Sequence, residues 1–257
     1  MEVEEYARIA AVEDDHWWYR NTRALVADLL TPRLRDRTDL RVLDAGCGPG
    51  GNGAWLAGHG TVVGVDRSSD ALRFVRERRR AVLPVLGDLT RLPLATGAVD
   101  VAIAVTVLYA VDDDDAALRE LARVLAPEGA LVLVEPAFPS LRREHDATVH
   151  GRRRYRRAPL RTRVEQTGLR VERATYAYSF LAPAAGGLAL LDRARHRRRP
   201  PEVHDTPAVG GSASDVERRA LDAVFAPMGH AERRALARVD LPVGTSVLVL
   251  ASKPATG

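Results

Sequence analysis

Three aspartates follow short apolar stretches of the sequence: Asp44, Asp66 and Asp88. Valines and leucines precede each of them, and apolar runs of this length predict buried strands. Where such strands lie parallel in one sheet, their carboxyl ends meet at one edge, so the three carboxylates would line that edge. A carboxylate in the place of Asp66 can accept hydrogen bonds from both hydroxyls of a ribose, and Asp88 can accept one from an adenine amine.

The first aspartate opens a glycine-rich run, Asp44-Ala-Gly-Cys-Gly48. Glycine at positions 46 and 48 leaves room for a tight turn and for the close approach of a ligand. The helix predicted at residues 51–57 would direct its free N–H groups to the same place. The unit indicates a nucleotide-type site. Its acid suits a cationic ligand better than a pyrophosphate, and no lysine follows the loop, because Lys253 is the only lysine in the chain.

Strands and helices alternate through the middle of the chain, which predicts an α/β fold with a doubly wound, mostly parallel sheet of seven strands. After the first strand, which ends at Asp44, strands are predicted at residues 61–66, 82–87, 99–105, 130–134, 169–180 and 244–252. Helices are predicted at residues 68–80, 116–125 and 159–168. In the sixth strand, the period of two would put Tyr176, Tyr178 and Phe180 on one face.

Segments outside this core are predicted to be helical. Residues 2–30 should form two helices, the second capped by Asp14 or Asp15, and residues 31–40 a linker broken by Pro32. An insertion at residues 181–241, with two or three helices, precedes the last strand. We divide the single domain into an N-terminal helical cap (1–38), a ligand-binding core (39–135) and an acceptor-side segment with the final strands (136–257).

The composition suits one domain with a single large core: 257 residues, of which 46% are hydrophobic. Cys47 is the only cysteine, so no intramolecular disulfide can form, which suits a reducing cytoplasm. It could act as a nucleophile, but a small filler residue in the loop is the simpler interpretation. No apolar run reaches 18 residues, so no membrane span is expected. The acidic N-terminus lacks a signal-peptide pattern, and we expect a cytoplasmic protein.

The formal net charge is +4, and 37 of the 38 basic residues are arginine. Residues 142–173 hold 11 arginines against four acids. A nucleic-acid patch is one interpretation of this segment. Acidic runs elsewhere argue against it, and favour a solvated face or an anion-handling lid. The acidic run at residues 112–115 likewise allows a metal site, but adjacent aspartates before a helix are more often capping residues, so no metal is expected.

Taken together, these motifs resemble class I S-adenosylmethionine-dependent methyltransferases with a core of the methyltransferase-11/25 type. The resemblance rests on residues 42–50, Gly64-Val-Asp66, Gly87-Asp-Leu89 and residues 121–133. It implies a Rossmann-like sheet whose last strand runs antiparallel beside the fifth. The run His16-Trp-Trp-Tyr-Arg20, with Arg23, is also similar to the leader of one bacterial methyltransferase subgroup. That subgroup usually has glycine where Asn21 stands here.

The resemblance implies S-adenosylmethionine as the cofactor and S-adenosylhomocysteine as the product. Asp44 would lie near the methionine amine, with Gly46 and Gly48 giving backbone room. Asp66 would bind the ribose, Arg67 would flank the adenine, and Asp88 and Leu89 would frame it. The leader would close the pocket, with aromatic faces toward the sulfonium and arginine toward the methionine carboxylate. The complete set of expected cofactor residues is Trp18, Tyr19, Arg23, Asp44, Ala45, Gly46, Cys47, Gly48, Asp66, Arg67, Gly87, Asp88, Leu89, Val105 and Thr106.

Catalytic candidates are fewer. Methyltransferases of this type often carry a Glu-His pair where Tyr109-Ala110 stands, so a base is absent there and Tyr109 would shape the acceptor pocket. A base is needed when the acceptor is an amine or a hydroxyl. His145 and His150 follow the fifth strand and are the candidates, with a surface role as the alternative for each. His16 is a third candidate if the leader folds over the pocket. Tyr155, Tyr176 and Tyr178 would line the acceptor cavity or pack in the core.

We therefore expect methyl transfer by in-line displacement to a small-molecule acceptor, in bacterial secondary metabolism. One alternative is an enzyme that binds the same cofactor for other chemistry, such as a cyclisation. Another is a cofactor-binding subunit without activity. The sequence does not distinguish a monomer from a homodimer, or O-, N- and C-methylation.

Overall fold

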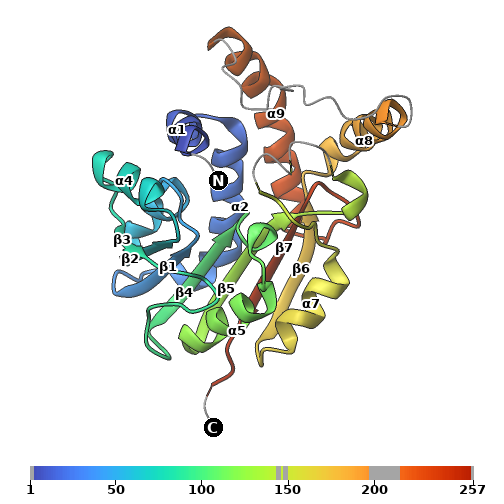
Figure 1. Cartoon of the computed structure of the whole chain (residues 1–257). Helices are drawn as coiled ribbons and strands as arrows, with labels where there is room; N and C mark the ends of the chain where they lie inside the picture. The colour runs from blue at the N-terminus through green and yellow to red at the C-terminus, as the bar shows by residue number, and fades with distance from the viewer. Residues whose placement is uncertain (1–2, 143–145, 147–149, 197–214, 256–257) are drawn as a thin grey trace.

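The computed structural model describes residues 3–142, 146, 150–196 and 215–255, and its centre is one seven-stranded sheet (Figure 1). The strand order is β3-β2-β1-β4-β5-β7-β6, and only β7 runs antiparallel, between β5 and β6. This confirms the doubly wound, mostly parallel sheet and the place of the last strand. The strands are β1 (Leu40–Ala45), β2 (Gly60–Asp66), β3 (Leu83–Leu86), β4 (Val99–Val105), β5 (Leu125–Pro136), β6 (Arg170–Ala177) and β7 (Ser246–Ser252).

Helices cover both faces of this sheet. The α-helices are α1 (Val3–Val12), α2 (Trp17–Leu34), α3 (Gly51–Ala54), α4 (Ser69–Glu77), α5 (Asp114–Val124), α7 (Arg157–Glu165), α8 (Ala182–His196) and α9 (Asp215–Leu236). Short 3-10 turns are η1 (Trp55–His59), η2 (Leu108–Ala110), η3 (Pro139–Leu141) and η4 (Ser179–Leu181). Among the described residues, no helix combines the length and hydropathy that a bilayer crossing requires.

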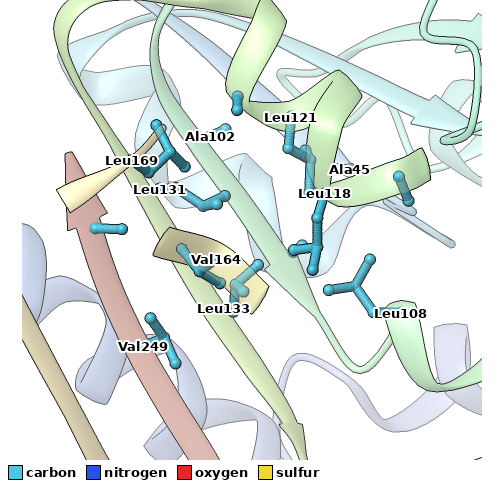
Figure 2. Close-up of a cluster of buried hydrophobic side chains, with 14 of the residues drawn as sticks. Ala45, Ala102, Leu108, Leu118, Leu121, Leu131, Leu133, Val164, Leu169 and Val249 are labelled. Carbon is cyan, nitrogen blue, oxygen red and sulfur yellow. The ribbon is translucent and has the colours of Figure 1, made fainter. Parts of the chain in front are cut away.

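Successive side chains along each strand point to opposite faces of the sheet, and they form two separate hydrophobic clusters. Leu43 of β1 belongs to the cluster under α5 and α7, whereas its neighbour Val42 belongs to the cluster under α2. Figure 2 shows the first cluster, in which Leu118 and Leu121 of α5 face the sheet. Both faces are therefore buried, as parallel sheets require. Each fully buried leucine contributes about 1.5–3 kcal/mol, so these layers hold the strand ends in fixed positions.

Helix α2 runs through Pro32, where the sequence predicted a linker. That prediction was wrong, because Leu30 and Leu34, one turn apart, are 0% and 5% exposed and pack in the core. Their burial outweighs the hydrogen bond that proline removes. The helix is capped by His16, whose Nδ1 accepts the Trp18 N–H, rather than by either aspartate before it.

The insertion before β7 contains α8 and α9, which extend beyond the same end of the sheet as α1 (Figure 1). Glu232 of α9 accepts the N–H groups of Tyr178 and Ser179, both at 2.6 Å, and so ties α9 to the end of β6. Strand β6 ends at Ala177, and Tyr178 adopts a left-handed conformation with φ 58°. Tyr178 thus packs in the cluster under α2 and Tyr176 in the other, which corrects the prediction that both lie on one face.

Candidate functional site

A cavity of about 1100 Å³ opens at the carboxyl ends of the parallel strands. Its walls come from the loops after β1, β2, β3 and β4, from the α1–α2 cap and from the segment that includes His150. Ligands of doubly wound sheets bind at this edge. The volume lies at the upper end of the range for small-molecule and cofactor pockets.

The glycine loop after β1 forms the floor of this cavity. Gly46 has φ 71°, and a Cβ there would lie 2.2 Å from the side chain of Val107, so only glycine fits between the two loops. Gly48 has φ 52°, and a Cβ on it would meet nothing within 4 Å. Because Gly48 also lines the cavity, a side chain would project into space that a ligand can use. The N–H groups of Gly46 and Cys47 both bond to the Val65 carbonyl of β2, which fixes the loop.

Asp66 is the last residue of β2 and lies in the cavity wall. One carboxylate oxygen accepts the Gly48 N–H and the other the Ser68 N–H, both at 2.9 Å. Burial raises the pKa of this carboxyl, and the hydrogen bonds from Ser68 and Gly48 oppose that shift. Each oxygen keeps an acceptor position beside these single bonds, as a diol ligand requires.

Asp88 and Leu89 line the cavity beside Asp66. The Asp88 carboxylate accepts both the N–H and the hydroxyl of Thr90 at 2.8 Å, and these bonds lower its pKa. Leu89 is 5% exposed and supplies an apolar surface. Arg67 also lies in this part of the wall. An apolar face next to an ionised acceptor matches the edge and face of a purine.

The loop after β4 is held from below by Glu135, at the end of β5. Its fully buried carboxylate accepts the N–H groups of Val107 and Leu108 with one oxygen and of Tyr109 with the other, at 2.9–3.2 Å. Burial raises the pKa of Glu135 to about 8, although the three hydrogen bonds act to lower it. Thr106 adopts φ 50° at the start of the loop. Glu135 therefore determines where the cavity-lining side chain of Tyr109 lies.

Tyr109 is buried, and burial raises the pKa of its phenol well above the ordinary value, with Glu135 the next largest influence. A phenol in this state keeps its proton at neutral pH and acts as a hydrogen-bond donor, not as a base. The neighbouring segment packs against it, since the Tyr109 carbonyl accepts the N–H groups of Arg152 and Arg153. His150, with φ 58°, and Asp146, ion-paired to Arg154, line the cavity there. His145 lies outside the described residues.

The acidic run before α5 is occupied by capping and ion pairs. Asp113 caps the helix by accepting the Ala116 N–H at 2.8 Å. Asp114, 4% exposed, accepts the Tyr155 hydroxyl at 2.7 Å and pairs with Arg163. These contacts agree with the capping interpretation of the run and place the Tyr155 side chain in the core rather than in the cavity wall.

The cap supplies the opposite wall of the cavity through α1, the turn after it and the start of α2. Of the leader residues expected here, Trp18 and Tyr19 line the cavity, and so does His16. Trp17 instead packs against Phe180 and Phe225, at ring distances of 6.3 and 4.8 Å. One tryptophan therefore packs and the other faces the ligand space.

Six cap residues in this wall were not expected from the sequence, and Tyr6 and Glu13 are the two with perturbed pKa values. Tyr6 lies near Asp66, and burial followed by that carboxylate raises its pKa to about 12. Its place on the inner face of α1 could have been found from helical periodicity. Glu13 stands in a turn, where periodicity carries no signal.

Four expected cofactor residues lie outside the cavity wall: Arg23, Asp44, Ala45 and Gly87. The Arg23 guanidinium donates to the carbonyls of Glu13 and Asp14 and holds the cap turn. Asp44 is 1% exposed and packs against Gly53 of α3. Burial raises its pKa to about 7, with Asp66 and Glu13 adding to the shift. One Asp44 oxygen has no hydrogen-bond partner among the described residues.

The cavity suits a cationic nucleoside derivative on four observations. Asp66 can accept from a ribose, and Gly48 leaves open space above the loop. Asn52, in the same wall, has a buried amide oxygen without a partner in the described part of the chain. The raised pKa values of Asp44, Asp66 and Glu13 reflect a buried acidic cluster, which a positive ligand would stabilise in its ionised form.

Comparison with known proteins gives consistent matches. A family model described as a methyltransferase domain matches residues 43–133. The malonyl-[acyl-carrier protein] O-methyltransferase of Pseudescherichia vulneris is 36% identical over 122 residues, 47% of this chain and 49% of that protein. The methyltransferase GfsG of Streptomyces halstedii is 35% identical over 124 residues, 44% of this chain and 45% of that protein. The chain thus spans less than half the length of either relative.

Among solved structures, the Haloferax volcanii methyltransferase in complex with its Trm112 activator has a TM-score of 0.61. The alignment covers 99% of this chain and 96% of that one, at 19% identity. At this identity the likeness concerns the fold.

Proposed function

The core of the chain, residues 43–133, belongs to the class I S-adenosylmethionine-dependent methyltransferase family, and we propose that the protein transfers a methyl group to a small-molecule acceptor. The observation that carries this proposal is the joint placement of Gly48 and Asp66 in one cavity at the carboxyl edge of the sheet. The bound cofactor supplies a methyl group already activated by a positively charged sulfur. The chain's own residues then have to bind, orient and exclude water.

On this proposal, Asp66 holds the ribose hydroxyls while Asp88 and Leu89 receive the adenine, with Arg67 at its side. Val105, Thr106 and the loop from Gly46 to Gly48 surround the methionine portion. Trp18 and Tyr19 cover it from the cap, where their electron-rich faces stabilise a nearby cation. Alignment of this kind accounts for much of the rate in a displacement reaction, because the reacting atoms must be held about 3–3.5 Å apart.

The acceptor would occupy the part of the cavity between Tyr109, His150 and the start of α5. Tyr109, which keeps its proton, donates a hydrogen bond to an acceptor oxygen or nitrogen and orients it. His150 is the residue we propose to take the acceptor's proton, because it lines the cavity beside Tyr109 and histidine is the side chain that most often acts as a general base. His145 stays a second proposal from the sequence.

The first test is calorimetric titration of the wild type with S-adenosylmethionine and S-adenosylhomocysteine. We expect micromolar binding of both. Asp66→Ala should weaken binding by about 1–3 kcal/mol, the scale of lost hydrogen bonds to a charged group. Asp100→Ala is the matched control. Asp100 pairs with Arg41 at the amino end of β4, the end of the sheet opposite to the cavity. Failure of the wild type to bind either compound would refute the proposal.

The acceptor can then be sought by incubating the protein with labelled cofactor and fractionated bacterial metabolites. Incorporation of label into a small molecule supports methyl transfer, and His150→Ala should slow it while leaving cofactor affinity unchanged. Conversion of an acceptor without label would instead favour cofactor-dependent chemistry of another kind. A secondary metabolite is our proposed acceptor class, supported by the space left in the cavity beside the cofactor site.

A further inference from the structure

Glu13, in the turn between α1 and α2, is a buried carboxylate that touches the cofactor loop. Its side chain is 2% exposed. One oxygen, Oε2, accepts the N–H of Gly51, the first residue of α3, at 3.1 Å. A Cβ on Gly51 would lie 2.3 Å from the same oxygen, so the cap packs directly on the backbone of the loop.

The other oxygen of Glu13 is held by two arginines that follow α4. Oε1 accepts from Arg78 at 2.9 Å and from Arg80 at 3.0 Å. One carboxylate therefore joins the cap, the beginning of α3 and the end of α4. If the Glu13 carboxylate were separated from these partners while still buried, its charge would be uncompensated, which is costly.

Asp14 provides an internal comparison, because it pairs with the same two arginines. Its carboxylate is bonded to Arg78 and lies 2.7 Å from Arg80. Unlike Glu13, its side chain is 45% exposed, and the partners of its carboxylate among the described residues, Arg78 and Arg80, lie outside the loop. The two acids thus share the charge interaction and differ in the contact with Gly51.

We propose that Glu13 is a positioning residue that couples docking of the N-terminal cap to the shape of the glycine loop. Cofactor binding and cap docking then favour each other, since each stabilises the same arrangement of residues 46–52. This inference rests on the proposed function for its cofactor. It also makes a statement about the free protein, in which the loop should lose order when Glu13 is removed.

The test compares Glu13→Ala with Asp14→Asn in two measurements. In hydrogen exchange of the free protein, Glu13→Ala should speed exchange in residues 46–54, whereas Asp14→Asn should leave those amides as in the wild type. In calorimetry with S-adenosylhomocysteine, Glu13→Ala should weaken binding at least about tenfold, and Asp14→Asn by less than about threefold. Circular dichroism and thermal melts establish that both variants are folded.

A second perturbation approaches the contact from the loop. Gly51→Ala places a methyl group against Glu13 and should weaken binding in the wild-type background. In the Glu13→Ala background the space is vacant, so the same substitution should cost much less, and the double-mutant cycle should show coupling. The Gly51→Ala single variant keeps the charge of Glu13, so its binding can be measured even if Glu13→Ala does not fold; unchanged affinity in that variant would then count against the coupling.

The outcomes separate the two proposals. If the wild type binds neither cofactor form, the proposed function fails, and exchange in the free protein still decides whether Glu13 orders the loop. If the wild type binds and Glu13→Ala behaves like Asp14→Asn in both measurements, with an additive cycle, Glu13 is a structural ion pair and the coupling is overturned.

Discussion

Asp44 offers a quantitative test of how the acidic cluster beneath the glycine loop behaves. Desolvation by burial, reinforced by Asp66 and Glu13, raises its pKa from 3.8 to about 7. Below pH 3.8 the carboxyl is protonated in both the folded and the unfolded chain. Between the two pKa values the unfolded chain releases the proton and the folded chain keeps it, so stability falls as pH rises and levels off above the folded pKa.

The perturbation is Asp44→Asn, which keeps the shape of the side chain and removes the titration. Integrating the proton linkage between pH 4.5 and 8.5 gives a loss of about 3 kcal/mol in the wild type that the variant does not suffer. The variant should therefore gain about that much free energy of unfolding relative to the wild type across this range. Asp44 is completely buried, so solvent does not screen the effect.

The assay is urea unfolding of both proteins without ligand at several pH values. Asp100→Asn is an instructive control, because the hydrogen bond from Arg41 lowers the pKa of Asp100. Its ionised form stabilises the fold fully at pH values above the unfolded pKa of 3.8, so this variant should lie below the wild type by a small and nearly constant amount between pH 4.5 and 8.5, because the pair with Arg41 is partly exposed. Parallel curves for Asp44→Asn and the wild type would refute the burial argument. A relative loss by the variant would mean that Asp44 is ionised in the free protein.

Three further perturbations test other parts of the site. Glu135→Ala should lower the free energy of unfolding by about 3 kcal/mol or more, because three N–H groups lose their acceptor and two of these are buried; a change below 1 kcal/mol in denaturant melts would contradict this. Gly48→Val should abolish calorimetric binding of S-adenosylhomocysteine, since the side chain enters the ligand space and the φ of 52° disfavours a β-branched residue; retained affinity would show that the loop is not the floor of the site. Tyr178→Phe should cost about 1–2 kcal/mol, because its hydroxyl bonds to Thr22 and the Trp18 carbonyl, and equal stability in thermal melts would argue against that network.

Much of the fold could be predicted because its signals are local. Short apolar runs ending in an acid located the first strands, and the strand–helix alternation gave the parallel sheet. Asp66 and Asp88 were expected at the ligand edge, and both line the cavity. Their position follows from backbone geometry alone, since Asp66 ends its strand and Asp88 follows one.

Asp44 shows where that reasoning stops. It is the fifth residue of a strand that continues to Ala45, so its side chain lies on the same face of the sheet as Val42 and does not point out from the edge. We predicted that the strand ends at Asp44, one residue too early. With the observed end at Ala45, Asp44 lies on a face of the sheet and not at the edge where ligands bind. The prediction that the chain breaks at Pro32 failed for another reason: the burial of Leu30 and Leu34 depends on tertiary packing, which the local sequence does not show.

The cap contacts could not be predicted from sequence, because they join distant segments. Glu13 lies 38 residues from Gly51 and 67 from Arg80. No local pattern indicates which of the chain's many arginines will pair with which acid. Such pairings follow only once the sheet has brought α1, α3 and α4 together.

The reactivity of Cys47 can report whether the glycine loop is open or closed. It is the only thiol, it lies in the cavity wall at 4% exposure, and burial raises its pKa well above the ordinary value. The thiolate is the nucleophile that attacks an alkylating reagent, so burial and protonation both protect Cys47 while the loop is closed. The alkylation rate of the unmodified chain therefore measures how often this loop opens. A ligand that closes the cavity will slow the alkylation of Cys47, so its binding can be followed without introducing a probe by mutation.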